Sequence, residues 1–280
     1  MHTDEPLHNI QAAAKAVLES NALLIGAGAG MGVDSGLPDF RGNEGFWNAY
    51  PPLRDKGLTF IDMANPRWFD SNPQQAWGFY GHRLNLYRKT IPHEGFQVLL
   101  RWAELLGAKS FVFTSNVDGH FQKAGFNPSR ITECHGSIHH LQCSKNCNGE
   151  IWENKMSDIE VDEDTLQAVS EMPHCPFCGE VARPNILMFR DFIWASNRSD
   201  GQEDKFISWL SNMHGKRLAI VECGAGTAIP TVRNECEAAN GTLIRINIRE
   251  PEGLTDSIGI QLGASEALLA IDREIHALSK

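Results

Sequence analysis

The stretch NALLIGAGAGMGVDSG, residues 21–36, joins a short apolar run to a loop rich in glycine. This pattern is typical of a buried strand that enters the phosphate-binding turn of a βα unit, where small residues let backbone N–H groups approach a ligand. The strict G-x-G-x-x-G fingerprint is not met, because a count from Gly28 ends on Val33. A glycine turn without a ligand therefore stays open at this point.

Apolar runs that alternate with helical patterns continue along the chain. Strands are expected at Lys109–Thr114, Ile131–Glu133, Asn185–Phe189, Leu218–Glu222 and Thr242–Ile248, and helices at 7–20 and 93–106. This alternation predicts an α/β fold, a Rossmann-like parallel sheet with helices on both faces and ligands at the carboxyl ends of its strands.

The composition changes twice along the chain, which predicts three parts. The Rossmann-like domain is expected to be discontinuous, made of residues 1–45, 91–142 and 181–280. Residues 46–90 are rich in aromatic side chains and proline and predict a helical insertion. Residues 143–180 contain cysteines and turns and predict a small zinc-binding module, with an acidic helix near 158–171.

The charge balance restricts the partners. The 280 residues carry 35 acidic and 25 basic side chains, a formal net charge of −10. This argues against a nucleic-acid or membrane partner, because both favour basic surfaces. No run approaches the roughly 18 apolar residues that span a bilayer. The first residues show no basic run followed by an apolar run, so a cytoplasmic location is expected. The sequence sets no oligomeric state.

Four of the seven cysteines form two close pairs, Cys143-x3-Cys147 and Cys175-x2-Cys178, separated by 27 residues. Two such pairs are typical of a closed tetrahedral thiolate site for structural Zn²⁺. Four reduced buried cysteines are one alternative, and a redox dithiol at Cys175 and Cys178 is another. His174 could compete as a ligand.

Five further motifs follow one another in order. They are GAGMGVDSGLPDFRG at 28–42, TSNVDG at 114–119, ECHGS at 133–137, RPNILMF at 183–189 and IN at 246–247. Together with the cysteine pairs, they resemble the sirtuin (Sir2-like) family over residues 26–250. The resemblance implies an NAD-dependent protein-lysine deacylase that releases nicotinamide and O-acyl-ADP-ribose. Its co-substrate would be NAD, its metal a structural Zn²⁺ and its partner an acylated protein lysine. The Rossmann-like domain would bind NAD, and the insertion at 46–90 would contribute to the acyl and cofactor pocket.

The resemblance also implies a role for each matching residue. His135 would be the general base, which suits an imidazole whose ordinary pKa is near neutrality. Asn116 and Asp118, also catalytic, would hold the nicotinamide carboxamide and a water, although both could instead cap the next helix. His139 and His140 are expected to be surface or satisfied core residues. The cofactor-binding residues would be Gly28, Ala29, Gly30, Asp39, Phe40, Arg41, Ser115, Asn116, Asp118, Gly224, Gly226, Thr227 and Asn247.

A second signal concerns the substrate. Tyr80-x-x-Arg83 resembles the pair found in sirtuins that prefer short acidic acyl groups, and residues three apart share a helix face. A phenol and a guanidinium could together bind a succinyl or malonyl carboxylate, giving desuccinylase or demalonylase activity. The alternative is an amphipathic helix with an exposed arginine. Ile186 and Phe189 would also contact substrate.

Four departures from the family pattern occur. Gly32 replaces a serine, Ser115 replaces a glutamine, Arg190 replaces a glycine expected beside the bound peptide, and Cys223-Gly-Ala-Gly-Thr replaces a Gly-Thr-Ser segment. Ser115 and Arg190 motivate a rival function, an ADP-ribosyltransferase or NAD glycohydrolase. A non-catalytic NAD sensor is a second rival, which the retained His135 disfavours.

Overall fold

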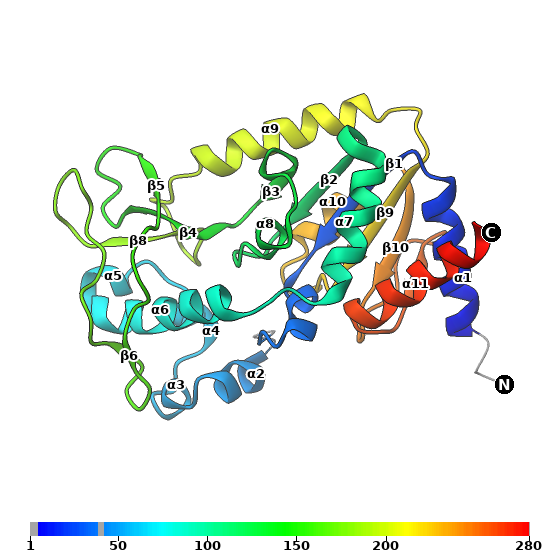
Figure 1. The fold of residues 1–280 in the computed structure, drawn as a ribbon. Coiled ribbons are helices and arrows are strands. Elements are labelled where there is room, and N and C mark those ends of the chain that lie inside the picture. The colour runs from blue at the N-terminus through cyan, green and yellow to red at the C-terminus, as the bar shows by residue number, and fades with distance from the viewer. Residues whose placement is uncertain (1–4, 39–41, 280) are drawn as a thin grey trace.

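The apolar run at the start of the decisive stretch forms strand β1 (Ala22–Ala27) near the centre of a six-stranded sheet (Figure 1). The computed structural model describes residues 5–38 and 42–279. All strands of this sheet are parallel, in the order β11-β10-β9-β1-β2-β3. The other five are β2 (Ser110–Thr114), β3 (Ile131–Glu133), β9 (Leu218–Cys223), β10 (Thr242–Ile246) and β11 (Ile258–Ile260). This is the strand order of doubly wound dinucleotide-binding folds, so the predicted fold class is confirmed.

Helices cover both faces of the sheet. On one face, Leu23 and Ile25 of β1 pack with helices α1 (Glu5–Glu19), α7 (Glu94–Leu106), α8 (His120–Ala124) and α11 (Ala264–Leu278). On the other face, Leu24 packs with α9 (Asn197–Asn212) and α10 (Thr231–Ala238). Successive side chains of a strand point to opposite faces, so β1 must be apolar throughout.

The aromatic segment is helical, as expected. It forms α2 (Gly42–Ala49), α3 (Pro51–Asp55), α4 (Phe60–Met63), α5 (Trp68–Ser71) and α6 (Pro73–Lys89). It lies at the end of the molecule away from the termini, together with an antiparallel sheet in the order β5-β4-β8 (Figure 1). These strands are Ile151–Glu153, Gly136–Cys143 and Ala182–Ile186. The helices and this sheet share one apolar core, in which Trp77 and Ile138 are fully buried.

Two expected elements were wrong. The acidic stretch at 158–171 forms a hairpin of β6 (Val161–Asp162) and β7 (Gln167–Ala168), not a helix. The Gln75 side chain of α6 donates to the Leu166 carbonyl (2.8 Å), and Leu166 has a positive φ of 53°, so tertiary contacts override local helix propensity.

The strand expected at 185–189 is shorter and lies elsewhere. β8 ends at Ile186 and pairs antiparallel with β4, outside the main sheet. The sixth strand of the main sheet is instead β11, which was not predicted, because three residues produce no clear apolar run.

Short 3₁₀ turns complete the fold at Ala29–Ser35, Gly107–Lys109 and Pro128–Arg130. Among the described residues, none of the helices has the length and apolarity needed to cross a membrane.

Candidate active site and metal centre

The loops that follow β1 and β9 meet at the carboxyl edge of the sheet, where the strand order reverses. The Gly28 N–H donates to the Cys223 carbonyl and the Gly30 N–H to the Gly224 carbonyl, both at 3.0 Å. Gly224 has a φ of +62°, and a Cβ there would lie 2.4 Å from the Gly30 carbonyl carbon. The glycines predicted to bind the cofactor are therefore brought together, and they are also required for contact between the two loops.

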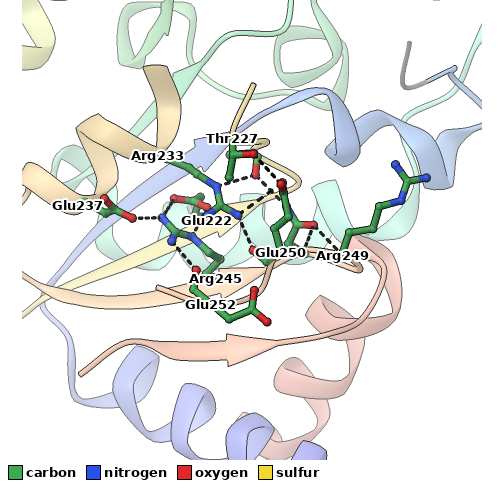
Figure 2. Close-up of polar contacts among 10 residues, drawn as sticks. Glu222, Thr227, Arg233, Glu237, Arg245, Arg249, Glu250 and Glu252 are labelled. Atoms are coloured by element: carbon green, nitrogen blue, oxygen red, sulfur yellow. Dashed lines mark hydrogen bonds and ion pairs between the residues drawn. The ribbon is translucent and has the colours of Figure 1, made fainter. Parts of the chain in front are cut away.

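Two other predicted cofactor residues join the β9 loop to the β10 loop. Asn247 is buried and donates from Nδ2 to the Ala225 carbonyl (2.8 Å), while its Oδ1 accepts from the backbone N–H groups of Arg249 and Glu250. The exposed Thr227 donates from its hydroxyl to the Glu250 carboxylate at 2.6 Å (Figure 2). Gly226 is half-buried, whereas Ala29 is exposed.

Buried charges support these loops and were not predicted. Arg245 of β10 pairs bidentately with Glu222 of β9, at 2.6 and 2.8 Å, and also bonds Glu237 (Figure 2). Arg233 of α10 donates to the Ala225 and Glu250 carbonyls. The sequence did contain a signal for the Glu222–Arg245 pair, because each of two apolar strands carries a single charged residue and the two charges are opposite. Parallel pairing of β9 with β10 places these two residues side by side.

The loop after β2 is tied to the loop after β1. The Ser115 N–H donates to the Ala27 carbonyl (3.1 Å), and the Asn116 side chain donates to the Gly28 carbonyl (2.9 Å). In the described part of the chain, no hydrogen bond joins the Asn116 side chain to the next helix, α8, so a capping role for Asn116 finds no support. Asp118 does accept from the His120 N–H at the start of α8 (2.8 Å), so the capping interpretation holds for one of its oxygens. Both side chains lie at the same sheet edge as the glycine loop.

His135 follows β3 at this edge and is half-buried. Burial lowers its pKa, against a hydrogen bond with the Ser115 backbone that raises it. The His135 carbonyl accepts from the Leu187 N–H (3.0 Å), and Ile186 pairs with Gly136. The strand expected to line the substrate cleft thus lies directly beside the expected general base.

The neighbouring histidines differ from each other. His139 approaches the Asp118 carbonyl with Nε2 at 2.8 Å and is a satisfied, half-buried residue, as expected. The Nδ1 of His140 is buried and has no hydrogen-bond partner, so the expectation of a satisfied residue was wrong there. Burial, with the Arg198 charge adding to it, lowers the pKa of His140 to about 4.

Tyr80 and Arg83 lie inside the helical segment. They are only 1% and 6% exposed, so the alternative with an exposed arginine was wrong. The guanidinium carbon of Arg83 is 5.7 Å from the centre of the Tyr80 ring, and the Tyr80 hydroxyl is buried without a partner. Phe189 is half-buried, its ring 6.1 Å from that of Phe60.

The loop after β8 keeps a glycine-like shape without glycine. Arg190 is exposed and has a φ of +57°, in the left-handed region that an L-residue rarely occupies. The Asp191 carboxylate holds the loop, since it pairs bidentately with Arg183 at 2.7 and 3.0 Å and accepts from the Met188 and Ile193 N–H groups. Both Asp191 and Arg183 side chains are fully buried in this ion pair.

The four paired cysteines form one cluster. Their sulfur atoms all lie within 4.8 Å of one another, with Cys143 and Cys178 at 3.6 Å and Cys147 and Cys175 at 3.7 Å. Zn–S bonds of about 2.3 Å in a tetrahedron separate sulfurs by about 3.8 Å, so these residues fit a structural Zn²⁺. Cys147 and Cys178 are exposed, which contradicts four buried thiols. His174 lies outside the cluster and contacts the Gly179 carbonyl instead.

Three predicted cofactor residues, Asp39, Phe40 and Arg41, lie outside the described residues.

The sheet order and its glycine-lined edge define a Rossmann-like nucleotide-binding protein. The Sir2 family model matches residues 28–204. A Pyrococcus abyssi protein named NAD-dependent protein deacylase is 32% identical over 237 residues, 85% of this chain and 86% of that protein. The chain belongs to the Sir2 family.

Solved structures agree on the fold. A complex of a Sir2 homologue with NAD superposes with a TM-score of 0.69 at 23% identity, covering 100% of this chain and 96% of that one. A Sir2 protein bound to an acetylated peptide superposes with a TM-score of 0.63 at 19% identity, covering 93% and 95%.

Metal analysis tests the cysteine cluster. We expect about one zinc ion per chain, and Cys175→Ala should lose it. Because metal binding contributes to folding, the melting temperature should fall by several degrees, at roughly 2–4 °C per kcal/mol. Elemental analysis and calorimetry measure both quantities. Cys134→Ala, outside the cluster, should keep its zinc; a zinc-free wild-type protein would contradict the assignment.

The pH dependence of kcat/KM tests the prediction that His135 is the general base. Only neutral imidazole accepts a proton, and the pKa of His135 lies below its ordinary value of 6.5. The active form is therefore present at pH 7 and is lost as the pH falls through the lowered pKa. We expect the acidic limb of kcat/KM for an acetyl-lysine peptide, measured from about pH 5 to about pH 9, to be centred below 6.5. A limb centred above that value would sink the assignment.

Proposed function

We propose that this protein is an NAD-dependent protein-lysine deacylase, which releases nicotinamide and O-acyl-ADP-ribose. The observation that carries the proposal is the position of His135, at the glycine-lined sheet edge and directly beside β8. The similar protein from Pyrococcus abyssi is named NAD-dependent protein deacylase, which supports this proposal.

The residues suit the chemistry. Cleavage of the nicotinamide–ribose bond of NAD supplies an electrophilic ribose carbon, which the acyl-lysine carbonyl oxygen attacks. His135, kept neutral by burial, takes a proton from a ribose hydroxyl, and the oxygen of that hydroxyl attacks the acyl carbon. The lysine amine then leaves, and addition of water yields O-acyl-ADP-ribose. Asn116, anchored on the Gly28 carbonyl, and the buried Asp118 carboxylate provide fixed polar groups for the nicotinamide carboxamide and a water.

The rival functions have less support. Ser115 joins the β2 loop to the β1 loop through its backbone N–H, so serine in place of glutamine does not disturb that contact. The Arg190 loop keeps a left-handed turn, so the substitution does not remove the loop shape. Transfer to protein, NAD hydrolysis and passive NAD sensing are therefore kept as outcomes of the test.

The purified protein should be incubated with NAD and with acetyl-, succinyl- and malonyl-lysine peptides. We expect nicotinamide release to require a peptide and to match the loss of its acyl group by mass. His135→Ala should reduce this rate by roughly 10²–10⁴-fold, the usual contribution of a general base. His214→Ala, at an exposed position, is the control. Release without peptide would indicate a glycohydrolase, a mass gain on protein a transferase, and binding without release a sensor.

We also propose that the enzyme accepts acidic acyl groups. Support comes from the burial of Tyr80 and Arg83, their proximity and the unpartnered Tyr80 hydroxyl. A buried polar group without a partner is costly, so a ligand that supplies an acceptor is favoured there. In Arg83→Ala, the ratio of succinyl to acetyl kcat/KM should fall by at least roughly tenfold, since hydrogen bonds to charged groups contribute about 1.5–3 kcal/mol. An unchanged ratio would rule out this preference.

We further propose a cytoplasmic location. None of the seven cysteines, all of which lie in the described part of the chain, forms a disulfide, which is typical of a reducing compartment. Cell fractionation with immunodetection tests it, and recovery in an oxidising compartment would contradict it.

A further inference from the structure

Arg83 is held in a cage of aromatic rings. Its guanidinium carbon lies 5.3 Å from the ring centre of Phe79, 5.5 Å from Tyr87, 5.7 Å from Tyr80 and 6.0 Å from Phe60. Cation–π attraction stabilises a desolvated guanidinium, but it does not fix the direction in which the N–H groups point. Recognition of a carboxylate needs that direction fixed, because the bidentate geometry is planar.

Tyr87 supplies the missing direction. It lies one helical turn after Arg83 on α6, and its hydroxyl accepts from both Nε (3.0 Å) and Nη2 (2.9 Å) of the guanidinium. The hydroxyl thus occupies the edge formed by Nε and Nη2. A carboxylate that binds the guanidinium bidentately would therefore use the edge formed by Nη1 and Nη2.

The protonation state of the Tyr87 hydroxyl matters as much as its position. Burial raises the pKa of Tyr87, Arg83 opposes this, and the nearby Asp118 charge adds to it. The phenol is therefore neutral. Its hydrogen bonds orient the guanidinium without cancelling the positive charge, whereas a carboxylate at position 87 would orient and also neutralise it.

Tyr87 is itself fixed. Its side chain is 5% exposed, and its ring lies edge-on to His120, 6.4 Å between centres. His120 is fully buried and starts the helix that Asp118 caps. The orientation of Arg83 is therefore coupled by direct packing to the loop after β2, which carries Asn116 and Asp118.

We propose that Tyr87 is a positioning residue that presets Arg83 for the carboxylate of an acidic acyl-lysine. The proposal rests on the acidic-acyl preference proposed above and extends it to a residue outside the Tyr80-x-x-Arg83 motif. It predicts that specificity for acidic acyl groups needs a hydroxyl at position 87 as well as the arginine.

The test compares Tyr87→Phe with Tyr50→Phe. Tyr50 is another buried tyrosine of the same core, but its hydroxyl contacts Nδ1 of His82 at 3.2 Å. In Tyr87→Phe, the ratio of succinyl to acetyl kcat/KM should fall by roughly tenfold, mainly through a higher KM for the succinyl peptide. Tyr50→Phe should keep the wild-type ratio, and zinc content and NAD binding confirm that both variants fold.

The double variant Arg83→Ala/Tyr87→Phe separates positioning from general packing. If Tyr87 acts through Arg83, its substitution should change the ratio no further once Arg83 is absent. A ratio that falls in Arg83→Ala but not in Tyr87→Phe overturns the role of Tyr87 and leaves the acyl preference standing. Equal falls in Tyr50→Phe and Tyr87→Phe also overturn it. A wild-type ratio that Arg83→Ala does not change removes both proposals.

Discussion

The approach of two backbone loops, one after β1 and one after β9, is the constraint on which the rest of the site depends. Gly30 and Gly224 meet so closely that neither position has room for a Cβ. This contact closes the sheet edge at the point where the strand order reverses, which is where parallel α/β sheets bind dinucleotides. Ser115, Asn116 and Asn247, which are predicted cofactor residues, donate hydrogen bonds to the backbone at these two loops.

Buried charges hold the loops around that contact. Glu222 and Arg245 neutralise each other beneath the β9 and β10 loops, and Arg183 and Asp191 do the same in the loop after β8. Each pair is almost fully desolvated, so loss of one partner would leave an unpaired buried charge, at a typical cost of 3–5 kcal/mol. The second pair also explains how Arg190 occupies a left-handed conformation that usually favours glycine.

Burial has opposite effects on the charges of the two residues proposed for the reaction, His135 and Arg83. At the sheet edge, burial keeps His135 neutral so that it can accept a proton. Inside the helical segment, aromatic rings and a neutral phenol surround Arg83, so the hydrogen bond from Arg83 to Tyr87 does not cancel the positive charge. Low-polarity surroundings thus remove the charge of the proposed base and preserve the charge of the proposed anion-binding residue, because arginine keeps its proton when buried and histidine does not.

The sequence by itself determined the fold class, the four cysteines of the cluster and the residues at the sheet edge, because each depends on local patterns: apolar runs, cysteine spacing and short motifs such as the one containing His135. Only the tertiary structure decided the hairpin at 161–168, the strand at Ile258–Ile260 and the contact of Tyr87 with Arg83. A hairpin stabilised by Gln75, or a strand of three residues, depends on partners distant in the chain. Tyr87 and Arg83 are near in sequence, but only the core packed around α6 buries both and directs their polar groups together.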